Sequence, residues 1–380
     1  MKLCMVVTDA VSFNVLYRGQ LEYLAEHGFN LTLICGGSAV EINKLRGRNV
    51  GSVIDVGLVR EPRMLRDVFS LLRLCLHFLT HRYELVVSTT PKALLIASIA
   101  ACIARQPRRV AFFQGRVYEN FSGRRRWFYC LLDRWAVACV NEVLFVSRSL
   151  MTEIGKDIPA SAEKGGVLAS GSGNGVCLQK FSRDAVSNEE LTVLRTELGI
   201  QSGDFVVLIV GRVCEDKGIA EIADVVQRMS SLDRAVKFVF VGAVEGVYAT
   251  ERLESLVKAG LAIHVRFTAD VVPYFGLADV HLFLTRREGF GNVAIEAAAM
   301  GVPTIAFDVV GVRDSVAEGT TGHRLHAGDI ESIVKLLRAW GHDRESTKRL
   351  FPEARAWVVQ EFAQGYVWEN YAKFYLSGRD

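Results

Sequence analysis

The chain has 380 residues, of which 50% are hydrophobic and 23% charged, with 33 Gly and only 7 Pro. This composition excludes a disordered, collagen-like or low-complexity protein, and at about 150 residues per domain the length predicts two domains, each with its own core. The net charge of +3 hides an asymmetry, because residues 1–180 hold 23 Lys and Arg against 14 Asp and Glu, whereas residues 181–380 hold 22 against 28.

The chain begins with a short apolar run. Residues 1–7 are mostly apolar, but Asp9 follows, so the run is too short for a secretory leader. The longest uncharged apolar run, residues 93–104, falls well below the roughly 20 residues that a membrane-spanning helix needs. The eight cysteines are scattered, without Cys-x-x-Cys spacing. We therefore expect a cytosolic protein with reduced thiols, no structural zinc and no membrane-spanning segment.

In the first half, short apolar runs alternate with segments of helical periodicity. The first run is followed by apolar positions between residues 16 and 25 that fall on one helical face. Continuous apolar strands indicate burial on both faces, as in a parallel sheet covered by helices. Strands are expected at residues 3–7, 31–35, 84–88, 110–113 and 143–146.

The pattern breaks in the middle of the chain and then restarts. Residues 160–175 are rich in Gly and Ser and predict a loop or hinge. The last thirty residues predict a terminal amphipathic helix with an aromatic face. The alternation of strand and helix predicts an α/β protein with two successive doubly wound units. Strands of the second unit are expected at residues 205–210, 236–241, 263–267, 280–284 and 304–307.

Two cations follow the expected strand 205–210. Arg212 and Lys217 lie in the segment 211–218, at the carboxyl end of a strand, where open α/β sheets bind ligands. Arg binds phosphate oxygens bidentately and Lys acts as a point charge, with about 1.5–3 kcal/mol for each charge-assisted contact. The segment therefore suits a phosphate. The alternative is that the two cations simply pair with Glu215 and Asp216.

A glycine-rich acidic segment, EGFGNVAIE at residues 288–296, follows the expected strand 280–284. Its glycines allow close approach of the backbone to a ligand, and Asn292 is expected as the N-cap or a first-turn residue of a helix. The amides and the dipole at such a helix start suit a phosphate. Glu288 and Glu296 then fit as acceptors of hydrogen bonds from sugar hydroxyls. The alternative is a capping carboxylate and a surface Glu.

Together, Gly-Arg-x-x-x-x-Lys-Gly at 211–218 and Glu-Gly-Phe-Gly-x-x-x-x-Glu-Ala at 288–297 resemble the nucleotide-sugar site of the retaining glycosyltransferases of family 4. The resemblance extends over nearly the whole chain, including residues 23–33, 173–181 and 308–314. It implies the GT-B fold, with two Rossmann-like domains facing across a cleft. The implied parts are an acceptor-binding domain over 1–176, a nucleotide-sugar domain over 177–358 and a C-terminal helix over 359–380 that packs back on the first domain.

The resemblance also implies residue roles. Arg212 and Lys217 would hold the donor diphosphate and stabilise the leaving nucleotide, and Glu288 would contact the transferred sugar. Glu296 would contact the ribose, and the base would lie near 268–271. The other donor-binding residues that it implies are Ser12, Gly211, Gly289, Phe290, Gly291, Asn292 and Val293. Retaining transfer in such enzymes runs on the front face, with the nucleotide phosphate accepting the proton, so neither cofactor nor metal is expected.

The chain departs from the family pattern at three places. Residues 11–14, Val-Ser-Phe-Asn, stand where the family often has a Gly-Gly turn after the first strand. Gln114 stands where many members have a His; it can hydrogen-bond a sugar but carries no charge. Cys177 follows the Asn-Gly-Val segment in place of an Asp, and we interpret it as a packing residue.

The basic half supplies the candidates for acceptor binding. Lys92, Gln114, Arg116 and Glu119 follow expected strands, and the two cations suit an anionic acceptor such as a lipid diphosphate; the alternative is solvated loop charge. The amphipathic segment 65–79 and seven arginines near aromatic residues predict contact with an anionic membrane surface, or otherwise a core helix with a basic rim. Nucleic acid is discounted because no nucleic-acid-binding motif is present. These arginines are Arg105, Arg108, Arg109, Arg124, Arg125, Arg126 and Arg134.

We therefore expect a retaining, metal-independent hexosyltransferase in cell-surface polysaccharide assembly. It would move a hexose or acetamidohexose from a UDP or GDP sugar to a lipid-linked saccharide, at the inner face of the cytoplasmic membrane. The alternatives are a sugar-nucleotide epimerase or hydrolase on the same fold, and a catalytically silent sugar-nucleotide-binding subunit of a polysaccharide complex. A dinucleotide oxidoreductase is disfavoured because no Gly-x-Gly-x-x-Gly follows the first strand.

Overall fold

The computed structural model describes residues 1–230, 236–347 and 349–377, and the chain divides into two units. Unit 1 comprises Met1–Gly175 and Gln364–Asp380, and unit 2 comprises Val176–Ala363. The chain thus changes unit after Gly175 and again after Ala363, whereas the sequence predicts boundaries after 176 and 358. The two crossing segments are joined in a single bridge between Val176 and Ala363, and the Val176 amide donates to the Phe362 carbonyl at 2.8 Å.

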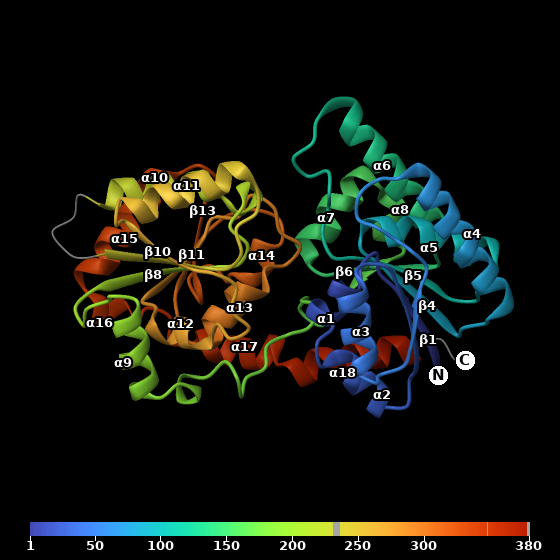
Figure 1. Cartoon of the computed structure of the whole chain (residues 1–380), viewed down its shortest axis with the longest axis horizontal. Coiled ribbons are helices and arrows are strands. Elements are labelled where there is room, and N and C mark those ends of the chain that lie inside the picture. The colour runs from blue at the N-terminus through green and yellow to red at the C-terminus, as the bar shows by residue number, and fades with distance from the viewer. Residues whose placement is uncertain (231–235, 348, 378–380) are drawn as a thin grey trace. The chain divides into compact units, whose positions relative to one another are not determined.

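Unit 1 is built on a seven-stranded parallel sheet in the order β3-β2-β1-β4-β5-β6-β7, with helices against both faces (Figure 1). Its strands are β1 (Lys2–Val6), β2 (Asn30–Cys35), β3 (Ser52–Asp55), β4 (Leu85–Thr89), β5 (Arg109–Phe113), β6 (Glu142–Phe145) and β7 (Gly165–Val167). Its helices are α1 (Ala10–Leu16), α2 (Gln20–Glu26), α3 (Ala39–Gly47), α4 (Met64–Thr80), α5 (Pro91–Ile103), α6 (Gly123–Ala138), α7 (Arg148–Asp157), α8 (Pro159–Glu163) and α18 (Gln364–Leu376).

Unit 2 is built on a six-stranded parallel sheet in the order β10-β9-β8-β11-β12-β13 (Figure 1). Its strands are β8 (Phe205–Val210), β9 (Val236–Val241), β10 (Ala262–Val265), β11 (Val280–Phe283), β12 (Thr304–Phe307) and β13 (Gly322–Leu325). Its helices are α9 (Asn188–Glu197), α10 (Ile219–Met229), α11 (Val247–Lys258), α12 (Val272–Leu277), α13 (Asn292–Ala299), α14 (Val312–Ser315), α15 (Ile330–His342), α16 (Arg344–Thr347) and α17 (Ala354–Phe362), with short 3₁₀ turns η1 (Arg183–Ala185) and η2 (Glu215–Lys217).

The strand order of unit 2 brings two loops together. The order reverses at β8, which lies between β9 and β11, so that Val207 is paired with Val280. At such a reversal the loops leaving the two neighbouring strands emerge side by side at the carboxyl edge of the sheet. The segment after β8 (211–218) and the segment after β11 (284–291) are therefore neighbours; we call them the β8 loop and the β11 loop.

The expected parallel strands are all present, and three further strands were missed. These three, β3, β7 and β13, each lie at an edge of a sheet. An edge strand has only one neighbouring strand and is less covered, so β3 and β13 lack a continuous apolar run. The prediction of a loop over 160–175 is wrong in part, because α8 reaches into this stretch and β7 lies within it.

The first and the last helical segments expected from the sequence each consist of two helices in the structure. The first helical segment is two helices, α1 and α2, because Gly19 has a φ of +77° and a Cβ there would lie 2.6 Å from the Trp368 ring. The expected terminal helix is also two helices, and α17 belongs to unit 2 whereas α18 belongs to unit 1. Helix α18 packs against α2, and the Trp368 Nε1 donates to Asn174 Oδ1 at 2.7 Å.

Candidate functional site

Backbone and side-chain contacts join the β8 and β11 loops of unit 2. The Lys217 ammonium donates to Glu288 Oε2, and the Arg287 guanidinium donates to Asp216 Oδ2 at 2.6 Å. The Arg286 amide donates to the Asp216 carbonyl at 2.9 Å. The structure therefore brings Lys217 and Glu288, 71 residues apart in sequence, into direct contact.

Two glycines allow the close packing that these loops require. Gly218 ends the β8 loop with a φ of +77°, and a Cβ there would lie 2.0 Å from the Leu284 carbonyl oxygen. Gly291 has a φ of +90°, and a Cβ there would lie 2.9 Å from the Phe283 ring and from Ser315 Oγ. Any other residue at either position meets both left-handed strain and a clash.

Helix α13 starts at Asn292, and its N-cap is Gly291, so Asn292 takes the second of the two placements expected for it, that of a first-turn residue. Gly291 has no side chain to accept from the first-turn amides, and no such cap bond is present. Helix amides without an intrahelical acceptor, together with the helix dipole, favour an anion. The start of α13, including the amide of Val293, is therefore suited to a phosphate or a hydroxyl oxygen.

Glu296 lies one turn further along α13 and is partly buried. Burial raises the pKa of its carboxyl to about 7, and the nearby Lys180 ammonium acts in the opposite direction. Within the described residues no side-chain hydrogen bond to Glu296 is present. Lys180 lies 3.1 Å from Asp270 Oδ1, in the segment 268–271 where the base is expected.

Arg212 lies on the β8 loop with about half of its side chain exposed, and its Nη1 donates to Glu245 Oε2 at 2.5 Å. The interpretation that Arg212 and Lys217 pair with Glu215 and Asp216 is wrong. Glu245 follows β9, and the bridge between Val213 and Val244 brings it to the β8 loop. Sequence spacing carries no signal for this pairing, because it depends on the neighbouring positions of two strands.

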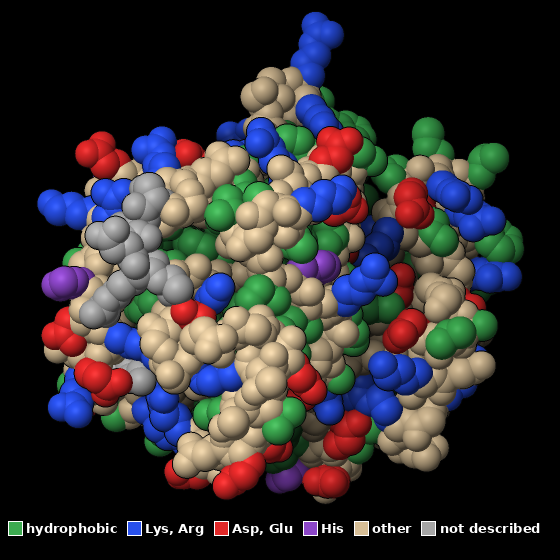
Figure 2. All heavy atoms as spheres, turned by 60° about the vertical axis from the view of Figure 1, so that its left-hand side comes forward, with side chains coloured by type: hydrophobic (Ala, Val, Ile, Leu, Met, Phe, Trp, Pro, Cys, Tyr) green, Lys and Arg blue, Asp and Glu red, His purple; other side chains and the backbone are tan. Residues whose placement is uncertain are grey.

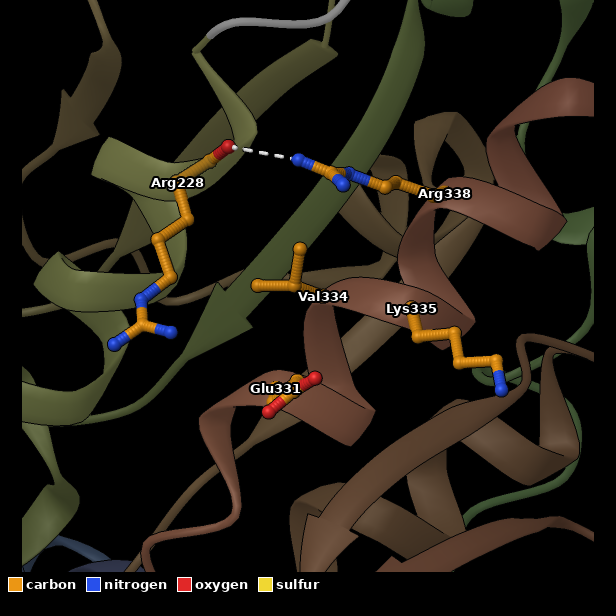
Figure 3. Close-up of a pocket in the computed structure, with 5 residues that line it drawn as sticks. All are labelled: Arg228, Glu331, Val334, Lys335 and Arg338. Atoms are coloured by element: carbon orange, nitrogen blue, oxygen red, sulfur yellow. Dashed lines mark hydrogen bonds between the residues drawn. The ribbon is translucent and has the colours of Figure 1, made fainter.

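A hollow on unit 2 lies away from these loops. It has a volume of about 620 Å³ and lies between α10 and α15 (Figure 3). Both signs of charge line it, and the Arg338 guanidinium donates to the Arg228 carbonyl at 3.5 Å. A second hollow, of about 480 Å³, includes Thr268 and Asp270 and so lies beside the expected base position.

In unit 1 the predicted acceptor residues take part in local contacts. Lys92 lies in the first turn of α5, and its ammonium donates to Asp67 Oδ1 at 2.8 Å. Gln114 follows β5, and its Nε2 donates to the Tyr17 hydroxyl at 3.1 Å. Ser12 lies in the first turn of α1.

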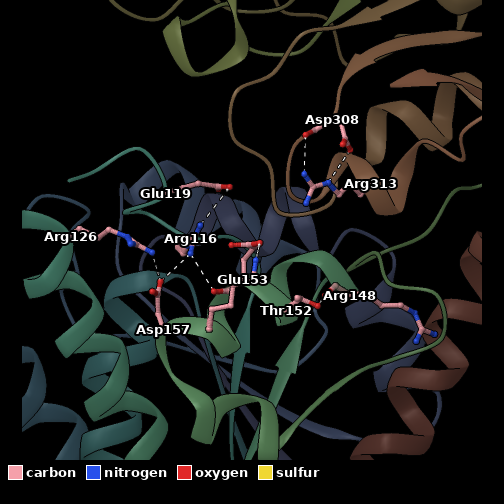
Figure 4. A network of polar contacts seen from close by, with 10 residues as sticks. Arg116, Glu119, Arg126, Arg148, Thr152, Glu153, Asp157, Asp308 and Arg313 are labelled. Carbon is pink, nitrogen blue, oxygen red and sulfur yellow. Dashed lines mark hydrogen bonds and ion pairs between the residues drawn. The ribbon is translucent and has the colours of Figure 1, made fainter. Parts of the chain in front are cut away.

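Arg116 is 7% exposed and belongs to a charged network in unit 1 (Figure 4). Its Nη1 donates to Asp157 Oδ2 at 3.2 Å, and its Nη2 lies 3.9 Å from Glu119 Oε1. Arg126 of α6 donates to the same Asp157 oxygen at 2.6 Å. The alternative of a solvated loop charge is therefore wrong for Arg116, which joins the loop after β5 to α7.

Helix α4 exposes most of its apolar side chains. Only Ser70, Leu74 and Phe78 are buried, so the alternative of a core helix is wrong for the remaining face. Helix α4 packs on α5, and α5 packs on α6, where aromatic side chains are also exposed. We call the exposed apolar side chains of α4 and α6 the apolar face. They are Met64, Leu65, Val68, Phe69, Leu72, Leu76, Leu79, Trp127, Phe128 and Trp135.

Among the described residues, no helix combines the length and the apolar character that crossing a bilayer requires. All eight cysteines are free thiols. Figure 2 shows basic and acidic side chains interspersed over the face that it presents, rather than a field of one sign.

Both halves of the sequence match known families. Residues 192–357 match "Glycosyl transferases group 1", and residues 15–169 match "Glycosyl transferase 4-like domain". The capsular polysaccharide biosynthesis glycosyltransferase CapM of Staphylococcus aureus is 29% identical over 95% of this chain and 93% of its own. An Escherichia coli relative, UDP-Gal:alpha-D-GlcNAc-diphosphoundecaprenol alpha-1,3-galactosyltransferase, is 24% identical over 84% of this chain and 81% of its own.

Solved structures share the fold. Anabaena HepE, crystallised in complex with UDP and glucose, superimposes with a TM-score of 0.80 at 20% identity, over 98% of this chain and 99% of that one. WaaG, a glycosyltransferase involved in lipopolysaccharide biosynthesis, superimposes with a TM-score of 0.76 at 16% identity, over 99% of this chain and 100% of that one.

Proposed function

The chain belongs to the GT-B glycosyltransferases, and on this basis we propose that it moves a hexose or acetamidohexose from a UDP or GDP sugar to a lipid-linked saccharide. The single observation that carries the proposal is the contact of Lys217 with Glu288 beside the start of α13. A cation, a carboxylate and the amides of a helix start without a side-chain cap are groups that suit a nucleotide-diphosphate sugar. The UDP complex of HepE and the diphosphoundecaprenol acceptor of the E. coli relative support the two substrate classes.

In the proposed reaction the protein positions the donor and stabilises charge on the leaving group. Lys217 and Arg212 exchange their carboxylate partners for the diphosphate, and Glu288 turns to the hydroxyls of the transferred sugar. The nucleotide phosphate accepts the acceptor's proton on the face from which the nucleotide leaves, so the anomeric configuration is retained. The two cations take the part that a metal ion plays elsewhere, and no metal is required.

Replacing Lys217 or Glu288 with Ala tests the donor site. Loss of preorganised charge stabilisation is expected to lower kcat/KM by about 100-fold or more. Transfer is measured with UDP-glucose, UDP-galactose, UDP-N-acetylglucosamine and GDP-mannose and a polyprenyl diphosphate-linked sugar, with and without a chelator. The product's anomeric configuration, read by NMR, tests retention.

Lys258→Ala is the matched control for Lys217→Ala, because Lys258 forms an exposed pair with Glu254 on α11. Wild-type rates in Lys217→Ala or Glu288→Ala would contradict the site assignment. Release of free nucleotide without acceptor would favour the hydrolase alternative, and nucleotide binding without turnover would favour the silent subunit.

We further propose that the apolar face rests on the inner leaflet of the cytoplasmic membrane, where a lipid-linked acceptor is presented. Exposed Leu and Trp side chains favour the acyl boundary, and each nearby cation adds about 1 kcal/mol on an anionic surface. The cations of this region include Arg66 and Arg73 on α4 and Arg124, Arg125 and Arg126 on α6.

Vesicle flotation tests this part. The wild-type chain is expected to float with phosphatidylglycerol vesicles and less with phosphatidylcholine vesicles. Leu72→Ser/Leu76→Ser is expected to reduce flotation on both vesicles, and replacement of Arg124, Arg125 and Arg126 by Ala only on the anionic ones. Val193→Ser, at an exposed apolar position of α9 in unit 2, serves as the control. Flotation that none of these changes affects would remove the membrane proposal.

A further inference from the structure

A second ion pair lies beside the Lys217–Glu288 pair with the opposite polarity. Asp216 directly precedes Lys217, and Arg287 directly precedes Glu288, so each loop presents one acid and one cation in consecutive positions. The Arg287 Nη2 donates to Asp216 Oδ2 at 2.6 Å while Lys217 donates to Glu288. Each charge of the candidate site therefore has a chain neighbour of opposite sign, and that neighbour is held by the facing loop.

The backbone holds the two loops together without these side chains. The Arg286 amide donates to the Asp216 carbonyl at 2.9 Å, and Thr285 Oγ1 lies 3.2 Å from the same carbonyl oxygen. The Asp216 and Arg287 side chains are 41% and 31% exposed, so their ion pair adds little to the free energy of folding. The ion pair therefore affects the candidate site through the positions in which it holds the Asp216 and Arg287 charges.

Either charge, if released, has a competing partner close by. The Asp216 carboxylate is next to Lys217 in the chain and already interacts electrostatically with Arg212. The Arg287 guanidinium is next to Glu288, and a guanidinium binds a carboxylate bidentately. Loss of one partner would therefore do more than remove a surface ion pair, because the nearest competing partner of the remaining charge lies in the candidate site.

We propose that Asp216 and Arg287 are positioning residues that keep each other away from the groups that bind the donor. Arg287 holds the Asp216 carboxylate off Lys217 and Arg212, and Asp216 holds the Arg287 guanidinium off Glu288. This inference rests on the proposed function, because it gives the pair its meaning relative to a donor diphosphate and sugar.

Single and double substitutions then have different consequences. Arg287→Gln leaves a free carboxylate among the phosphate-binding cations, so it is expected to weaken UDP binding about tenfold and to raise KM for the donor more than it lowers kcat. Asp216→Asn removes the carboxylate that holds the Arg287 guanidinium away from Glu288, so this guanidinium is expected to pair with Glu288 and kcat to fall while UDP binding is kept. The double variant Asp216→Asn/Arg287→Gln frees neither charge and is expected to recover most of both losses.

The test is calorimetric titration with UDP and with GDP, followed by donor kinetics. Both are measured on the full-length wild type, the two single variants and the double variant. Asp224→Asn and Arg228→Gln are matched controls, because this Asp–Arg pair of α10 has similar exposure and makes hydrogen bonds of 2.9 and 3.0 Å. Recovery in the double variant supports the proposal. If the Asp216–Arg287 ion pair only held the two loops together, the double variant would be at least as impaired as the worse single variant. That result would overturn the proposal.

The two proposals fail in different ways. A wild-type chain that binds UDP or GDP and transfers sugar, with no recovery in the double variant, leaves the proposed function standing and removes the role of the pair. A wild-type chain that binds neither nucleotide removes the proposed function, and the role of the pair in donor binding falls with it.

Discussion

Glu296 is the residue of the candidate site whose protonation is most altered by its surroundings. Burial raises its pKa from 4.5 to about 7, so the folded chain favours the neutral carboxyl. A group with a raised pKa contributes stability that is complete below its unfolded pKa and is lost as the pH rises through the folded value. The stability of the chain is therefore expected to fall between about pH 5 and pH 8 because of this one side chain.

Glu296→Gln removes that dependence. Relative to the wild type, the variant is expected to gain about 1–3 kcal/mol in free energy of unfolding between about pH 5 and pH 8. Urea denaturation at the two pH values measures this difference. Glu254→Gln, at an exposed position on α11, controls for loss of charge alone. A difference between Glu296→Gln and wild type that does not change with pH would contradict the assigned cause.

At this scale the sequence was enough to nominate the residues of the candidate site but not to predict the partners with which they pair. Arg212, Lys217 and Glu288 stand out because their spacing from expected strands places them at a ligand-binding edge. Glu245 and Arg287 carry no such signal, since each meets its partner only through the packing of two loops from different strands. Ion pairs between loops depend on the order of the strands in the sheet, which a single sequence does not specify.

At the scale of elements, the turn from β8 through the β8 loop to α10 depends on one glycine. Gly218→Ala is expected to cost about 3 kcal/mol or more, from left-handed strain of about 1 kcal/mol plus the clash with the Leu284 carbonyl, and to lower turnover because Lys217 shifts. Gly199 has a φ of +65° but nothing near its Cβ, so Gly199→Ala should cost only the strain. Denaturation midpoints and donor kinetics compare the two; equal effects would show that the clash is relieved.

The strands that sequence reasoning missed are only partly buried. The strands inside both sheets are covered by neighbours and helices and so appear as apolar runs, whereas β3 and β13 are half-exposed edges. The expected single helix at the carboxyl end was wrong for another reason. Its aromatic residues recur along the whole segment without a break in the sequence pattern. In the structure, however, Ala363 separates α17 from α18, and the two helices belong to different units.

At the scale of the whole molecule, the charge asymmetry of the sequence follows the two units. Unit 1 holds 24 Lys and Arg against 16 Asp and Glu, and unit 2 holds 21 against 26. The acidic unit nevertheless concentrates Arg212, Lys217, Arg286 and Arg287 on two adjacent loops. The charge balance of each half therefore indicated the proposed membrane-facing unit, but only local spacing indicated the candidate site.

The return of α18 to unit 1 also sets the order in which the two units are completed during synthesis. Unit 2 is one continuous segment, and all of it has been synthesised before Gln364 is added. Unit 1 still lacks the helix that supplies the buried side chains of Tyr371 and Tyr375. Domains commonly fold in the order in which they are made. Of the two units, the one whose synthesis begins first therefore receives its last helix after the other is complete, and its surface beneath α18 stays open until that helix has been made.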